Sequence, residues 1–87
     1  MRNMSPDGKA INERFFHAIE LLKETGQLKG VKTFATKYGV NQGNLTSVKT
    51  HMDAYTIKPE YLMYLVRDFS MSAEWLLLGV GSPFIHP

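Results

Sequence analysis

Apolar residues recur every three or four positions along most of this chain, which is the spacing of an amphipathic α-helix. Five segments show it: residues 9–25, 31–38 and 42–51, a fourth that begins at Pro59, and a short fifth between Ser72 and Gly79. No segment of convincing length alternates with the period of two that marks a half-buried strand. The pattern therefore predicts an all-α fold, a compact bundle of about five helices.

The two ends of the chain lack this spacing. Residues 1–8 contain a Ser-Pro-Asp-Gly turn sequence and are predicted to form a flexible N-terminal arm. Residues 80–87 are punctuated by glycine and proline and are predicted to be a C-terminal tail. One helical domain over residues 9–79 is expected between them, because 87 residues fit a single small domain.

The same pattern indicates which residues face the core. The fourth helix is expected to turn four residues inward: Leu62, Leu65, Val66 and Phe69. The fifth carries the run Trp75-Leu76-Leu77-Leu78 and is expected to be mostly buried, in the core or in a dimer interface. Three residues exceed what a small core is expected to hold, so a homodimer contact is one interpretation of them: Leu78, Phe84 and Ile85.

The segment from Val31 to Thr50 has the features of a helix-turn-helix. Five positions at fixed spacing hold suitable residues: Ala35, Gly39, Val40, Leu45 and Val48. Ala35 leaves room midway along the first helix for the second to pack closely, and Gly39 tolerates the positive φ of the turn. Asn41 is a good N-cap for the second helix. Two helices joined by so short a turn are expected to cross steeply.

The second helix of this motif has a distinctive polar face. With Leu45, Val48 and Met52 turned inward, the opposite side carries amides and hydroxyls, has a lysine at its edge and contains no carboxylate. A solvated helix face more often mixes glutamate with lysine. Asparagine and glutamine pair with the major-groove edge of adenine, and serine and threonine can donate to or accept from bases. This face is predicted to read DNA, with ordinary solvent-facing residues as the alternative.

Charge narrows the choice of partner. The chain has a net charge of +2, but residues 29–58 carry five lysines and one aspartate, a net charge of +4, whereas the remainder has five basic and seven acidic residues. A basic middle favours a polyanionic partner, of which nucleic acid is the commonest. No apolar run approaches a membrane span, and the start lacks the apolar stretch of a signal peptide, so a cytoplasmic location is expected.

Catalysis and metal binding find no support in the residues. The chain has no cysteine, which excludes disulfides, thiolate zinc sites and cysteine nucleophiles. His17, His51 and His86 are scattered without the spacing of metal ligands, and the carboxylates lie on separate helices. We therefore expect no enzyme activity, no cofactor, no metal and no small-molecule substrate.

Two stretches resemble the lambda-repressor-like (Cro/XRE-type) helix-turn-helix regulators of the phage-repressor kind. The first comprises Phe34-Ala35, Gly39-Val40-Asn41, Leu45 and Val48. The second, Ser72-Ala73-Glu74-Trp75-Leu76-Leu77-Leu78-Gly79-Val80-Gly81, looks like the Ser-x-x-Trp-Leu-Leu-x-Gly-x-Gly ending that is common after the fourth helix of phage-repressor DNA-binding domains.

The resemblance implies base contacts from six residues: Asn41, Gln42, Gly43, Asn44, Thr46 and Ser47. Phosphate contacts are expected from five others: Lys32, Thr33, Lys37, Lys49 and Thr50. Many relatives open the first helix of the motif with a glutamine that grips a phosphate. Here Val31 holds that position, and Lys32 or Thr33 is expected to substitute for it.

The leading hypothesis is a sequence-specific, double-stranded DNA-binding transcriptional regulator, a repressor of the phage or plasmid type. It would insert the helix 42–51 into the major groove and act as a homodimer on the nucleoid. The alternative is a protein-interaction or antitoxin-like helical module that uses the apolar surface between Leu77 and Ile85.

Overall fold

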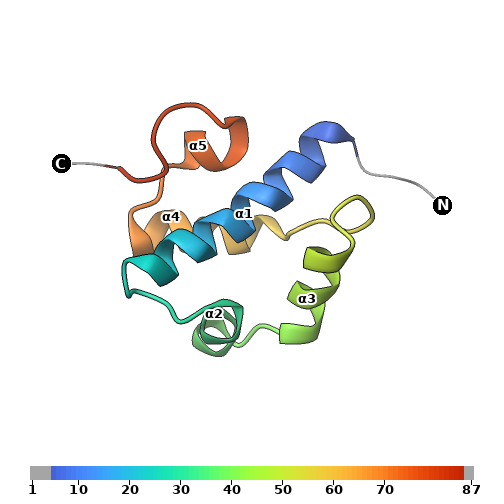
Figure 1. Ribbon diagram of the computed structural model, residues 1–87, viewed down its shortest axis with the longest axis horizontal. Coiled ribbons are helices and arrows are strands. Elements are labelled where there is room, and N and C mark those ends of the chain that lie inside the picture. Colours follow the sequence, from blue (N-terminus) through green and yellow to red (C-terminus); the bar gives the residue numbers. More distant parts are fainter. Residues whose placement is uncertain (1–4, 86–87) are drawn as a thin grey trace.

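The computed structural model describes residues 5–85 and folds them into a bundle of five α-helices (Figure 1). In chain order these are α1 (Pro6–Glu24), α2 (Val31–Tyr38), α3 (Gln42–Thr50), α4 (Pro59–Phe69) and α5 (Ala73–Leu78). Between residues 5 and 85 the only strand-like pairing is an isolated antiparallel bridge between Met71 and Phe84. The predicted all-α bundle is confirmed. Among these helices, none is both long enough and apolar enough to cross a bilayer.

The start of α1 differs from the prediction. The helix begins at Pro6 because Ser5 is its N-cap: the Ser5 hydroxyl accepts a hydrogen bond from the backbone N–H of Gly8 at 3.1 Å. Proline suits the first helical position, where its missing N–H leaves no partner unsatisfied. The Ser-Pro-Asp-Gly sequence is thus a helix start, and the predicted flexible arm is wrong for residues 5–8. Residues 1–4 lie outside the described part of the chain.

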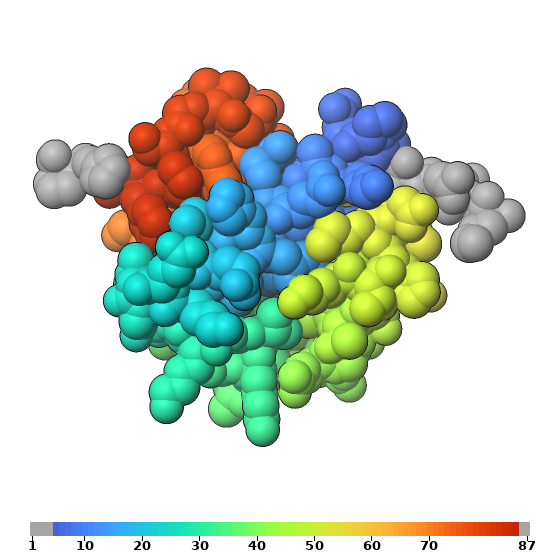
Figure 2. Space-filling model, in the orientation of Figure 1, coloured from blue at the N-terminus to red at the C-terminus, as the bar shows by residue number. Residues whose placement is uncertain are grey.

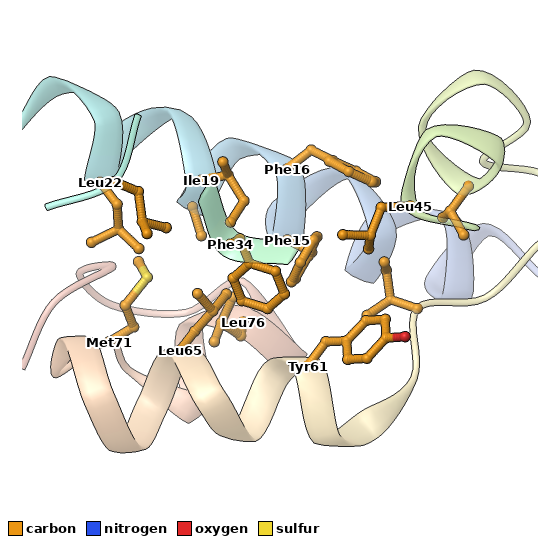
Figure 3. Close-up of a cluster of buried hydrophobic side chains, with 14 of the residues drawn as sticks. Phe15, Phe16, Ile19, Leu22, Phe34, Leu45, Tyr61, Leu65, Met71 and Leu76 are labelled. Atoms are coloured by element: carbon orange, nitrogen blue, oxygen red, sulfur yellow. The ribbon is translucent and has the colours of Figure 1, made fainter. Parts of the chain in front are cut away.

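Every helix contributes at least one fully buried residue to the core, among them Phe15, Phe34, Leu45, Leu65 and Leu76. Figure 3 shows these side chains gathered between α1 and α4. The rings of Phe15 and Phe34 meet edge to face, with centroids 5.4 Å apart. Burying a side chain of this size contributes roughly 1.5–3 kcal/mol, so the shared core is what holds the short helices α2, α3 and α5 in place.

The inward face of α4 is rotated relative to the prediction. Leu65 is fully buried as expected, but its buried companion is Tyr61, whereas Leu62, Val66 and Phe69 are only partly buried. Tyr61 lies one helical turn before Leu65, and its ring packs near those of two core phenylalanines. A tyrosine is assigned to the surface by polarity, but its ring fills the space that the core offers there.

Within the single chain, the core takes up only part of the run that was predicted to be buried in the core or in a dimer interface. Trp75 and Leu76 are buried, whereas the side chains of Leu77 and Leu78 are 49% and 68% exposed. A six-residue helix packs on one side only, so consecutive leucines cannot all reach the core. The guanidinium of Arg14, on α1, donates hydrogen bonds to the carbonyl oxygens of Leu76 and Leu77, both at 2.9 Å. These bonds satisfy carbonyls at the end of α5 that have no partner within the helix.

The C-terminal segment returns along the residues that precede α5. The backbone N–H of Ser72 donates to the carbonyl of Pro83 at 2.7 Å, and that of Ile85 donates to Ser70 at 2.8 Å. Phe84 is consequently half-buried against the core, while Ile85 remains 58% exposed. The predicted tail is therefore attached to the bundle as far as residue 85, and residues 86–87, including His86, lie outside the described part.

Candidate nucleic-acid interface

The turn between α2 and α3 has the backbone that the sequence predicted. Gly39 adopts a left-handed conformation with φ of 64°, and the backbone N–H groups of Gly39 and Val40 both bond to the carbonyl of Ala35. Asn41 is extended, and its side-chain oxygen accepts a hydrogen bond from the backbone N–H of Asn44 at 3.2 Å. The N-cap prediction is confirmed, and α3 begins immediately after it. Figure 1 shows α2 nearly end-on beside α3, so the two helices cross steeply.

Two residues fix which side of α3 faces outward. Leu45 is fully buried and Val48 is 7% exposed, whereas Met52, which lies beyond the end of the helix, is only partly buried. All six predicted base-contacting residues are exposed: Asn41, Gln42, Gly43, Asn44, Thr46 and Ser47. This follows because one buried pair a turn apart sets the rotation of a nine-residue helix.

Gly43 has a structural role that the sequence did not indicate. A Cβ placed on Gly43 would stand 3.0 Å from Oδ1 of Asn41, which is the oxygen that caps α3. This is closer than side-chain carbons usually approach an oxygen. Glycine at this position therefore leaves space for the cap.

The five predicted phosphate-contacting residues differ in their exposure and in the contacts that they already make within the protein. Lys32 on α2 and Lys49 on α3 are exposed, and Thr33 is partly exposed. Figure 2 shows side chains of the α2 region standing out from the surface next to α3. Thr50 is exposed, but its hydroxyl donates within the helix, to the carbonyls of Thr46 or Ser47. The hydroxyl hydrogen of Thr50 is therefore already engaged in a hydrogen bond within the protein.

Lys37, the remaining predicted contact, lies beside a cluster that joins α2 to α4. Its ammonium is 5.6 Å from the ring centroid of Tyr38, which stacks on Tyr64 with centroids 4.0 Å apart. The Tyr38 hydroxyl donates to Asp68 at 2.5 Å, and the Arg67 guanidinium donates two further hydrogen bonds to the same carboxylate, each 2.9 Å long. These contacts hold the C-terminal end of α2 against α4.

In the same cluster the negative charge of Asp68 is balanced by Arg67. The Arg67 guanidinium and the Tyr38 hydroxyl hold the pKa of the Asp68 carboxyl well below its usual value, so it stays ionised but paired. Burial, together with the bond to Asp68, raises the pKa of Tyr38 well above that of a free phenol. Tyr38 therefore remains a hydrogen-bond donor at any physiological pH.

At the N-terminal end of α2, the chain differs from the family that it resembles, because Val31 stands where many members have a phosphate-binding glutamine. Val31 is half-buried against the core, so it is not placed to bind a phosphate. The N-cap is Gly30, whose missing side chain gives the first turn no capping bond. The backbone amides of this turn, with Lys32 and Thr33, are the groups that remain for an anion.

The surface beside α3 includes residues that the sequence analysis did not identify. The loop that follows α3 brings Tyr55, Thr56 and Lys58 next to Asn44 and Ser47, and a pocket of about 380 Å³ lies between them. Val48 and Tyr61 form the rest of its lining. Tyr55 is 52% exposed despite its size. Only one feature of the sequence points to these residues: Lys58 belongs to the basic segment 29–58 and directly precedes the helix-starting Pro59.

Within residues 5–85 no three histidine, aspartate or glutamate side chains come together to hold a metal ion. The candidate site is the exposed surface of α3 with the loop residues beside it, because exposed polar and basic side chains gather there. Comparison of the chain with protein-family models, with curated proteins and with solved structures found no match.

Proposed function

We propose that this protein is a sequence-specific regulator of transcription that binds double-stranded DNA and reads the major groove with α3. One observation carries the proposal: the exposed face of α3 offers amides and hydroxyls, has no carboxylate, and is fixed outward by Leu45 and Val48. The resemblance of the α2–α3 segment to lambda-repressor-like regulators supports the same assignment.

The reading residues are the side chains that project from the first two turns of α3. Gln42 and Asn44 can pair with adenine through two hydrogen bonds, and Thr46 and Ser47 can donate to or accept from base edges. Asn41 keeps its side-chain oxygen on the helix cap, so its amide nitrogen is the group left for DNA. Gly43 contributes backbone only.

Cations around α3 would hold the two DNA strands. Lys32 is exposed in the first turn of α2, and Lys58 with Thr56 lies beside Asn44 and Ser47 of α3. Lys49 at the C-terminal end of α3 adds a third contact. Such contacts fix the position of the helix in the groove and supply the part of the affinity that depends on salt.

A homodimer completes the proposal. Two copies would read half-sites about 34 Å apart on a pseudo-palindrome, and occupation of a promoter would repress transcription on the nucleoid. The exposed Leu78 and Ile85 are the candidate contacts between the copies.

Selection of bound duplexes from a random pool, followed by titrations with the selected site, tests the proposal. Gln42→Ala and Thr46→Ala should each cost roughly 1–3 kcal/mol at the cognate site and leave binding to random duplex unchanged. Lys49→Ala should weaken binding to every sequence and reduce the salt slope by about 0.9. Lys23→Ala, on the exposed face of α1, is the matched control and should do neither. Failure to enrich any sequence, with no salt-dependent binding, would reject the proposal.

A second candidate, a protein-interaction or antitoxin-like module, is favoured by one observation. A pocket of about 330 Å³ between α4 and α5 has an apolar lining: Pro59, Leu62, Met63, Val66, Ala73, Leu76 and Leu77. Met63 and Leu77 are each close to half exposed there. Gel filtration with and without random duplex, at low and high salt, separates the candidates. A mass that is unaffected by DNA and by salt would favour the interaction module.

A further inference from the structure

The most deeply buried polar side chain in the described part of the chain belongs to Asn12, on α1. Its exposed fraction is 0%. The carboxamide nitrogen donates to the backbone carbonyls of Met52 at 3.0 Å and Tyr55 at 2.6 Å, and the carboxamide oxygen accepts from the backbone N–H of Ile57 at 3.0 Å. All three partners belong to residues 52–57, the loop between α3 and α4.

These bonds determine the shape of the loop. Residues 52–57 form no helix: the backbone N–H groups of Ala54 and Tyr55 donate to the carbonyl of His51, and other backbone groups of the loop bond to the Asn12 side chain. A buried backbone group without a partner would be costly. A primary amide offers two donors and an acceptor in one plane, which matches two carbonyls and one N–H. The side chain of Ile57, 3% exposed, also packs in the core. The loop is therefore attached both to Asn12 and to the core.

The position of this loop matters because of what it carries. Tyr55, Thr56 and Lys58 form the wall of the 380 Å³ pocket that faces Asn44 and Ser47 of α3. Leu45 and Val48 pack α3 into the same core that contains α1, so both walls of the pocket are placed relative to α1. Figure 1 shows the loop lying beside the first half of α1.

We propose that Asn12 is a positioning residue for DNA binding: it touches no DNA, but its three hydrogen bonds to residues 52–57 set Lys58 at the distance from α3 that a DNA strand requires. The inference rests on the proposed function, since it assigns Lys58 to a backbone phosphate. Asn12 does not line the pocket and acts on it through the loop backbone.

A double-mutant cycle on DNA affinity tests this role. In the wild-type protein, Lys58→Ala should weaken binding to duplex DNA about eight-fold at 0.1 M salt, since one lost phosphate contact lowers the salt slope by about 0.9. In the Asn12→Ser variant the loop is released, so the same Lys58→Ala change should alter affinity less than about two-fold. Lys49→Ala, on α3, is the matched control and should cost about eight-fold in both backgrounds.

The outcomes separate the two proposals. Equal effects of Lys58→Ala in both backgrounds, or no effect in the wild type while Lys49→Ala still weakens binding, would overturn the role of Asn12 and leave the DNA-binding proposal intact. A wild-type protein that binds no duplex would reject the DNA-binding proposal and this inference with it.

A measurement on the wild-type protein covers the case in which Asn12→Ser does not fold. The Ile57 amide should exchange with solvent as slowly as core helix amides, on the order of a thousand-fold slower than an unstructured peptide. Exchange at the rate of an open loop would overturn the inference.

Discussion

Gly43 and the Asn41 cap are predicted to be energetically coupled, independently of any ligand. Asn41 Oδ1 accepts from the backbone N–H of Asn44 at 3.2 Å, and a Cβ on Gly43 would lie 3.0 Å from that same oxygen. The substitution Gly43→Ala therefore requires the capping oxygen to shift, which lengthens a hydrogen bond that is already long.

Two effects of similar size then oppose one another. Alanine in place of glycine in a helix stabilises by up to about 1 kcal/mol, and loss of an N-cap costs about 1 kcal/mol. Gly43→Ala alone is expected to leave the free energy of unfolding within about 0.5 kcal/mol of the wild-type value. In the Asn41→Ala background the cap is already absent, so the same change should stabilise by up to about 1 kcal/mol.

Urea unfolding followed by helical circular dichroism measures all four proteins of this cycle. Thr50→Ala serves as the control partner for Gly43→Ala, because seven residues separate the two along α3, about 10 Å, and such pairs add within about 0.5 kcal/mol. If Gly43→Ala stabilises the wild-type and Asn41→Ala proteins equally, the oxygen moves at no cost and the steric argument fails.

Four other substitutions have defined outcomes. Leu45→Ala should lower the free energy of unfolding by about 2–5 kcal/mol in a urea titration, because the side chain is fully buried. Thr46→Ala, on the exposed face, should change it by less than about 0.5 kcal/mol, and equal effects would contradict the burial of α3. Arg14→Met should cost roughly 1–2 kcal/mol in thermal unfolding followed by tryptophan fluorescence, since two carbonyls of α5 lose their donors; an unchanged melting curve would show that these bonds contribute nothing. Asp68→Asn should destabilise the protein by a constant amount above about pH 5, and the difference should shrink as the pH falls below about 4, because Arg67 holds the folded-state pKa of this carboxyl below its unfolded value. A difference that persists unchanged at about pH 2 would contradict this linkage.

The elements that local chemistry specifies were predicted closely. α2 has the bounds that its pattern gave, Asn41 is the N-cap of α3, and Pro59 is the first residue of α4. Each of these depends on residues within a few positions of the helix end: a capping side chain at Asn41, the fixed φ of Pro59, and the left-handed conformation that Gly39 allows at the end of α2.

The errors arose where one local pattern is compatible with two outcomes. Ser-Pro-Asp-Gly can form a turn or start a helix, and in this chain it starts one, with Ser5 as the cap and Pro6 as the first helical residue. Tyr61 is buried and Leu78 exposed, against their polarity, because the space available at each position depends on the neighbouring helices. Hydrophobicity alone does not contain that information.

The sequence by itself determined the helices, the turn at Gly39 and the outward polar face of α3. The reason is that burial of one helix face and capping of a helix end both depend on residues only three or four positions apart. Only the tertiary structure decided what surrounds that face. The bonds from Asn12 to the loop, from Arg14 to α5 and from Tyr38 to Asp68 join residues up to 45, 63 and 30 positions apart. Partners so distant meet only after the helices have packed, so their pairing follows from the shape of the common core rather than from any local pattern.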